Sequence, residues 1–288
     1  MRRSLAAALS LAALAVAPAC GPASSAPSST SSGPHTIGAK VLLTAANATR
    51  AAGSAEVTMD MTMPSAAGTI HMHGRGLFRI GTPALGELHL SANVAGRSFP
   101  MDERIIGTVF YMRSPVFAQA IPAGKRWLKL DLSAMGSAGN ALGSAMNNGQ
   151  SDPTQTLTYL QATADSIQNL GAEDVGGVST THYHAVVVFK KAVELLVQRA
   201  SPAQRPALRR LYAQFESQTG ITDYPADVWI DGQGLVRKMS FSMPMTATGE
   251  RMDMTMAMSH FGVPVHITAP PAGQVADLST MAAAGQQQ

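Results

Sequence analysis

The methionines between residues 250 and 260 stand at every second position, and this spacing constrains the fold more than any other feature of the chain. In the sequence ERMDMTMAMSH they are Met252, Met254, Met256 and Met258, with polar or small residues between them. Strict alternation is typical of a β-strand, because successive side chains of a strand point to opposite faces. The segment therefore predicts a strand with one soft apolar face and one polar face.

Two more segments repeat this pattern. EVTMDMTMPS contains Met59 and Met61 at alternate positions, and KMSFSMPM contains Met239 and Met243. A tightly packed β core favours Val and Ile, whereas methionine is flexible and common at adaptable binding surfaces. The chain has 17 Met beside only 8 Phe and 2 Trp. Two interpretations follow, an ordinary core beneath the helices or the wall of a binding cavity.

Most of the remaining chain is also strand-like. In the first half, short alternating runs are separated by turn residues, which predicts an antiparallel meander. These runs cover 55–63, 68–80, 84–95, 97–105, 107–112 and 126–132. In the second half, strands are expected at 167–177, 178–189, 223–231, 235–247 and 250–261, with a short extended tail at 265–268.

Helical spacing of apolar residues predicts helices at 36–53 and 151–165, and two more within 190–220, where Pro202 and Pro206 interrupt the pattern. About ten strands and three or four helices indicate an α+β fold. Because a large antiparallel sheet tends to curl, we expect a curved sheet, or half-barrel, with helices packed on its concave side. A closed lipocalin-like barrel is the alternative.

The N-terminus predicts export. Residues 1–19 have a basic start and a short apolar run, as in a secretory signal peptide. Cys20, the only cysteine, follows in a setting that resembles a bacterial lipobox, so we expect it to be lipidated. The alternative is an ordinary signal peptide with an incidental cysteine. We expect residues 20–35 to form a Gly, Pro and Ser-rich tether, 36–280 one domain, and 281–288 a disordered tail. The Gly, Ser and Asn-rich stretch 134–153 is expected to be a loop.

Charge argues against a nucleic-acid partner. The signal peptide carries two of the 21 Lys and Arg residues, which leaves the mature chain nearly neutral against its 18 Asp and Glu. The sequence contains no basic run and no basic patch interleaved with aromatic residues. We therefore expect no nucleic-acid partner, and no sequence motif predicts a cofactor.

No pattern predicts catalysis or metal binding. The pairs His71 with His73 and His182 with His184 each leave one strand face, but no Asp, Glu or Cys lies at a recognisable spacing from them. The common hydrolase, zinc-protease and nucleotide-binding motifs are absent from the sequence. We therefore predict no metal site, no catalytic residue and no enzyme activity. Five carboxylates could in principle pair as acid and base, although their spacing singles out no two of them: Asp60, Asp102, Glu103, Asp131 and Asp227.

Three motifs in the second half resemble, in order and spacing, the LppX/LprAFG lipoproteins of mycobacteria and related actinobacteria. They are GGVSTTHY at 176–183, DVWID at 227–231 with Gly234 and Arg237 after it, and PPA at 270–272. The likeness covers roughly residues 36 to 280. It implies a fold similar to the lipoprotein carrier LolA, with an apolar cavity between a curved sheet and its helices.

The resemblance also implies a function. Members of this family carry acylated lipids or lipoglycans from the inner membrane toward the outer envelope. The chain is accordingly expected on the extracytoplasmic side of the cell membrane, held there by its N-terminal lipid anchor, with a membrane transporter as a candidate partner. The alternatives are an envelope sensor or structural lipoprotein that binds a protein partner and, third, a secreted hydrolase. We hypothesise that six methionines line the lipid cavity: Met59, Met61, Met252, Met254, Met256 and Met258.

Overall fold

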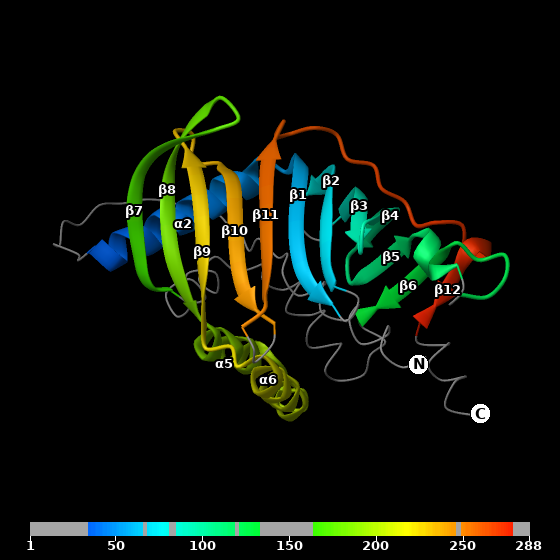
Figure 1. The fold of residues 1–288 in the computed structure, drawn as a ribbon. Coiled ribbons are helices and arrows are strands. Elements are labelled where there is room, and N and C mark those ends of the chain that lie inside the picture. The colour runs from blue at the N-terminus through cyan, green and yellow to red at the C-terminus, as the bar shows by residue number, and fades with distance from the viewer. Residues whose placement is uncertain are drawn as a thin grey trace.

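The computed structural model describes residues 34–65, 68–80, 85–118, 121–132, 164–245 and 249–278. Twelve strands form one open, curved sheet in the order β12-β6-β5-β4-β3-β2-β1-β11-β10-β9-β8-β7, as Figure 1 shows. Neighbouring strands are antiparallel, except that β12 runs parallel to β6. The predicted curved antiparallel sheet is confirmed. Because β12 and β7 are its two edges, the closed barrel does not form.

The first six strands make the expected meander. They are β1 (Ser54–Ser65), β2 (Gly68–Arg79), β3 (Leu85–Val94), β4 (Arg97–Ile106), β5 (Val109–Arg113) and β6 (Trp127–Asp131). The others are β7 (Ala164–Val175), β8 (Val178–Val188), β9 (Asp223–Asp231), β10 (Val236–Pro244), β11 (Arg251–Ser259) and β12 (Val275–Asp277). Each strand longer than three residues lies close to where alternation predicted it.

Strands β1 and β11 join the two halves of the sheet. Both carry alternating methionines, and their register sets Met59 opposite Met256 and Met61 opposite Met254. Directly opposed residues of antiparallel strands share a face. The methionines of two segments far apart in the sequence therefore form one continuous surface near the middle of the sheet.

Three helices are described. Helix α2 (Pro34–Ala51) crosses the sheet and packs on β7 and β10 (Figure 1). The amide N–H of Val236 donates a 2.8 Å hydrogen bond to the buried hydroxyl of Thr49, which fixes this helix on β10. Helices α5 (Phe189–Arg199) and α6 (Arg205–Thr219) pack on each other at one end of the sheet. They are the two pieces that Pro202 and Pro206 predict.

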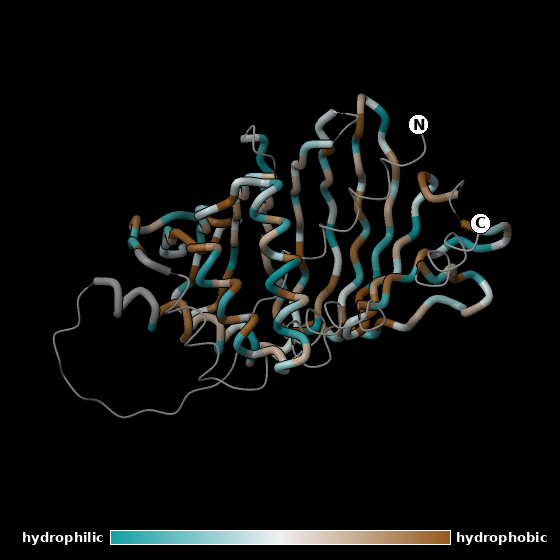
Figure 2. Tube along the Cα trace, turned by 90° about the horizontal axis from the view of Figure 1, so that it is seen from below, coloured by the Kyte–Doolittle hydropathy of each residue, from teal (hydrophilic) through white to brown (hydrophobic). Residues whose placement is uncertain are grey.

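Buried and exposed positions alternate along β1 and β11, so the sheet has one apolar and one polar face there. Figure 2 shows apolar and polar residues alternating along the strands. We call the face under α2 the helix-side face and the opposite one the outer face. Two clusters of buried residues lie on the helix-side face. Cluster 1 contains Leu42, Ala45, Ala55, Val57, Ile167, Ala185, Ile230, Val236, Met256 and Met258. Cluster 2 contains Met59, Met61, Met63, Met72, Leu88, Leu90, Met252 and Met254.

Two details differ from the sequence-based expectation. Residues 265–268 form no strand, and the final pairing is instead made by β12, which is only three residues long and follows the short 3-10 helix η4 (Ala272–Gln274). A three-residue strand is too short to show alternation. Several expectations fall on residues outside the described ranges. They are the signal peptide, the lipidation of Cys20, most of the tether, the loop at 134–153, the helix at 151–165 and the tail at 281–288. Within the described part, no helix has the length and apolar character needed to cross a membrane.

Candidate ligand-binding site

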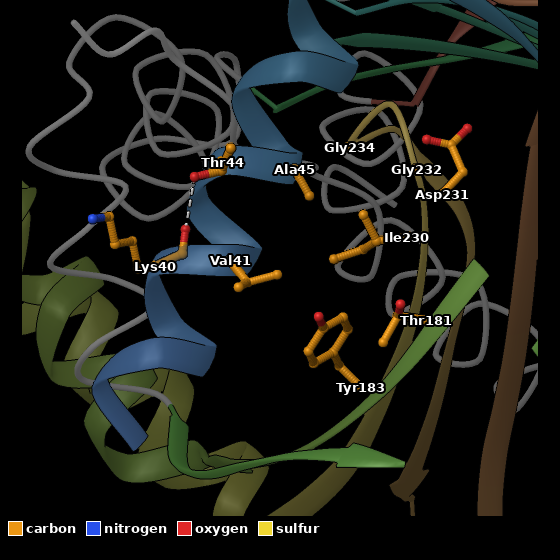
Figure 3. A pocket seen from close by; sticks show the side chains of 10 residues that line it. All are labelled: Lys40, Val41, Thr44, Ala45, Thr181, Tyr183, Ile230, Asp231, Gly232 and Gly234. Carbon is orange, nitrogen blue, oxygen red and sulfur yellow. Dashed lines mark hydrogen bonds between the residues drawn. The ribbon is translucent and has the colours of Figure 1, made fainter. Parts of the chain in front are cut away.

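A groove of about 530 Å³ lies between helix α2 and the ends of β8 and β9. Figure 3 shows Val41 of α2 and Tyr183 of β8 on opposite sides of it. The volume falls within the ~300–1,000 Å³ of typical small-molecule sites. Its lining residues are Lys40, Val41, Thr44, Ala45, Thr181, Tyr183, Ile230, Asp231, Gly232 and Gly234.

The groove has an apolar wall that continues into the core. Ala45 and Ile230 belong to cluster 1, and Val41 and Tyr183 pack against it. The same cluster contains Met256 and Met258, although no methionine is among the groove's lining residues. The methionines therefore lie in the apolar layer next to the groove rather than on its surface.

Asp231 closes the groove at the turn between β9 and β10. Its Oδ1 accepts hydrogen bonds from the amide N–H groups of Gln233 and Leu235, each at 2.9 Å. Its Oδ2 lies 2.6 Å from Nε of Arg237. The guanidinium of Arg237 in turn stands over the ring of Phe261, 4.9 Å from its centroid. Both oxygens of the carboxylate thus bind groups of the chain itself and stabilise the turn that borders the groove.

All six methionines of the sequence hypothesis are brought together on the helix-side face, each 3% to 6% exposed. Met256 and Met258 lie in cluster 1, and the other four in cluster 2. Phe241 and Met243 of β10 pack against cluster 2 as well. One face therefore collects the flexible side chains of three neighbouring strands, and its role as a cavity wall stays a prediction.

Glu103 is the carboxyl that stands apart on the helix-side face. Its direct partners across the sheet are Leu88 of β3 and Met112 of β5. Within the described residues its side chain has no hydrogen bond and no ion pair. Burial raises the pKa of Glu103 to about 7. The sequence includes this residue among five carboxylates, but nothing in its spacing separates it from the rest.

The carboxylate beside it has the opposite environment. Asp102 points to the outer face, where it lies 2.8 Å from Nδ1 of His89 and 2.6 Å from a terminal nitrogen of Arg113. Burial alone would raise the pKa of Asp102, but the hydrogen bonds from these two side chains outweigh burial and lower it. The five candidate carboxylates lie on β1, β4, β6 and β9, and no two of these strands are adjacent. The described sheet therefore does not pair two of them as acid and base.

The second histidine pair has acidic companions in space that sequence spacing does not reveal. His182 and His184 lie 2.9 Å and 2.8 Å from the same Oδ1 of Asp227, and His182 also lies 3.1 Å from Glu173. The companions come from β9 and β7, on either side of β8, so spacing along one strand could not reveal them. His182 also stacks on Trp229 at 4.2 Å. No described group of His, Cys, Asp and Glu has the arrangement of a metal site.

No protein-family model matches the chain. A Streptomyces griseus protein, described as an uncharacterized 31.2 kDa protein of the rplA-rplJ intergenic region, is 27% identical over 189 residues. The match covers 65% of this chain and 59% of that protein, so the chain spans less than two thirds of its relative.

The chain is also similar to solved structures of two lipoproteins. LppX of Mycobacterium tuberculosis has 14% identity and a TM-score of 0.48, with 81% of this chain and 99% of that chain covered. LprF of Mycobacterium bovis has 11% identity and a TM-score of 0.43, with 82% and 98% covered.

Proposed function

We propose that the chain is a membrane-anchored lipoprotein that binds an acylated lipid or lipoglycan and transfers it from the inner membrane toward the outer envelope, without catalysis. One observation carries the proposal. The methionines of β1, β10 and β11 form a continuous deformable face, and the cluster that contains Met256 and Met258 also forms the wall of the groove under α2. The three sequence motifs that resemble LppX/LprAFG lipoproteins support the same function.

The energetics explain why such a face suits a lipid carrier. Removing one CH₂ from water is worth about 0.8 kcal/mol, so a chain of about sixteen carbons needs about 12 kcal/mol of burial to leave a bilayer. The groove is too small to supply this by itself if only Val41, Ala45, Tyr183 and Ile230 contact the chain. Neighbouring methionines can change rotamers at low cost. We infer that the ligand enters at the groove and displaces methionine side chains as it extends along the helix-side face.

The proposed anchor is the lipidated Cys20, joined to the domain by the tether at 20–35. Replacement of Cys20 by Ser should release the protein from membranes, because serine has no thiol to carry the lipid. Membrane fractionation of cells that express each form measures this. A Cys20→Ser protein that remains in the membrane fraction would contradict the anchor.

The protein-partner alternative receives no support from the described surface. Its large exposed apolar side chains are Val116, Leu170 and Leu211, which lie in η2 (Pro115–Phe117), β7 and α6. Apolar residues scattered singly are usual on any protein surface, whereas a docking site shows a contiguous patch.

The test is mass spectrometry of an organic extract of the full chain, purified from an actinobacterial host. We expect an acylated lipid in stoichiometric amount. Met254→Asp should abolish it, because a charge would then stand in the apolar path. Ala257→Asp is the matched control, since Ala257 lies on the same strand but faces outward, opposite Lys238. A clean extract from folded wild-type protein, or equal lipid in the folded Met254→Asp variant, would overturn the proposal.

A further inference from the structure

The helix-side face carries one ionisable group in the middle of strand β4, and its surroundings are apolar in every direction along the sheet. Glu103 is flanked by Leu88 and Met112 across the strands and by Met101 and Ile105 along its own strand. Leu88 is 3% exposed and belongs to cluster 2, against which Met101 packs. The carboxyl therefore belongs to the surface that the methionines form.

An unpaired carboxyl in such a place is costly. Burying a polar group without a hydrogen bond destabilises a protein, and burying a charged one costs more. The charged residues on either side of Glu103 in β4 are both paired. Asp102 lies beside His89 and Arg113, and Arg104 forms an ion pair with Glu87. Glu103 has no such partner among the described residues, so no described ion pair accounts for a carboxyl at this position.

Glu103 is also accessible to a ligand. The residue as a whole is partly exposed, whereas the six methionines are buried. No titratable side chain faces it from its direct neighbours on β3 and β5, which are Leu88 and Met112. The raised pKa of Glu103 agrees with this apolar setting. Among the described residues, no side chain satisfies the carboxyl, so a donor group of a bound ligand can do so.

We propose that Glu103 is a specificity-determining contact that accepts a hydrogen bond from an uncharged hydroxyl group of the bound lipid. This inference rests on the proposed lipid-binding function and adds the chemistry of the headgroup. A hydroxyl needs one acceptor, which Glu103 provides. An ammonium group has three N–H donors that point in different directions, and one carboxylate on this otherwise apolar face cannot satisfy them all. A phosphate would place a second negative charge beside the carboxylate.

The experiment compares three lipids that differ only in the headgroup. They are 1,2-dipalmitoylglycerol, its 3-O-methyl ether and dipalmitoyl phosphatidate, each offered to the full chain at pH 8 from neutral phosphatidylcholine vesicles. Protein-bound lipid is extracted and quantified. Because a hydrogen bond to a charged group contributes about ten- to a hundredfold in affinity, we expect the wild-type protein to prefer the diacylglycerol over the ether by at least about tenfold.

Two variants test whether Glu103 causes the preference for the lipid with a free hydroxyl group. Glu103→Leu should lose the preference for the hydroxyl while binding the ether at least as well as the wild type. Glu103→Gln, which keeps a neutral acceptor, should retain a reduced preference and bind phosphatidate more tightly than the wild type. Both replacements remove a buried charge, so neither should unfold the protein, and a thermal melt checks this.

The outcomes separate the two proposals. If the wild type binds all three lipids equally, or if Glu103→Leu keeps the full hydroxyl preference, the role of Glu103 is wrong and lipid binding stands. If the folded wild type binds none of the three lipids and yields no lipid from its native host, the proposed function itself is wrong.

Discussion

Arg237 holds Asp231 in a buried ion pair at the turn between β9 and β10, with Nε 2.6 Å from Oδ2. The side chains are 17% and 4% exposed. The second carboxylate oxygen of Asp231 accepts the amide N–H groups of Gln233 and Leu235, so one residue fixes both the turn and the start of β10. The same turn contributes Gly232 and Gly234 to the groove under α2.

Replacing Asp231 by Ala should therefore destabilise the protein by roughly 3 kcal/mol, because it leaves the Arg237 charge and two amide groups without a buried partner. Urea unfolding measures the loss. The control is Glu194→Ala, which breaks an ion pair with Arg209 whose two side chains are about half exposed. That exchange should change stability by no more than about 1 kcal/mol. Equal effects of the two variants would contradict the structural role of Asp231.

The fold could be predicted from the sequence to a large extent, because alternation directly reports which side chains share a strand face. The limits of β1, β2, β4 and β9 are within about two residues of their predicted limits. Gly74 and Gly76 in turn mark a close approach of the backbone between β2 and β3, since a Cβ at either position would collide with β3. These are local properties, and a short segment of sequence determines each of them.

The pairing of distant strands could not be predicted in this way. Neither segment by itself predicts that β1 pairs with β11 or that Met61 lies opposite Met254. The contacts of His182 with Glu173 and Asp227 could not be predicted either, because they join residues of three different strands. The groove requires α2 to lie over β8 and β9, and the sequence predicts the helix but not its position. Non-local contacts of this kind determined every part of the candidate site.

Glycine 76 gives a test of the close approach. A Cβ added at Gly76 would lie 1.7 Å from the carbonyl oxygen of Glu87 on β3, far inside contact distance. Gly76→Ala should therefore force the two strands apart and destabilise the protein by more than about 2 kcal/mol. Gly232→Ala is the matched control, because a Cβ there meets nothing within 4 Å. Thermal melts of both variants measure the difference, and a Gly76→Ala protein as stable as the control would show that β2 and β3 do not approach so closely.

The unpaired carboxyl of Glu103 should make the ligand-free protein less stable as the pH rises, which is the opposite of the usual effect of a paired carboxylate. Its pKa is raised from 4.5 to about 7 in the folded state, so the folded protein binds more protons than the unfolded chain between these values. The contribution of Glu103 to stability should therefore fall as the pH rises from about 4.5 to 7, by at most about 3 kcal/mol. In Glu103→Gln this fall should disappear, and the variant should be more stable than the wild type at pH 8.

Asp102 is the control for that measurement, because its pKa is shifted in the opposite direction. Its pKa is lowered in the folded protein by His89 and Arg113, so its contribution to stability is present at neutral pH and is lost as the pH falls through the acidic range. Asp102→Asn should remove this acid-side loss and leave the change between pH 4.5 and 7 in place. Urea unfolding across the pH range measures both variants. If Glu103→Gln and the wild type show parallel curves, Glu103 is not buried as a lone carboxyl.

The choice of methionine itself can be tested without disturbing the fold. Met254 and Met256 are each 3% exposed, and exchange to Leu nearly conserves their volume, so each replacement should cost less than about 1.5 kcal/mol. Leucine has fewer rotatable bonds and cannot re-pack around ligands of different length as methionine can. The Met254→Leu, Met256→Leu protein should therefore still bind lipid, but with a narrower range of acyl-chain lengths in its extract. Leu88→Met, the reverse exchange on the same face, should widen the range. Unchanged chain-length distributions in both proteins would mean that these methionines are ordinary core residues rather than an adaptable wall.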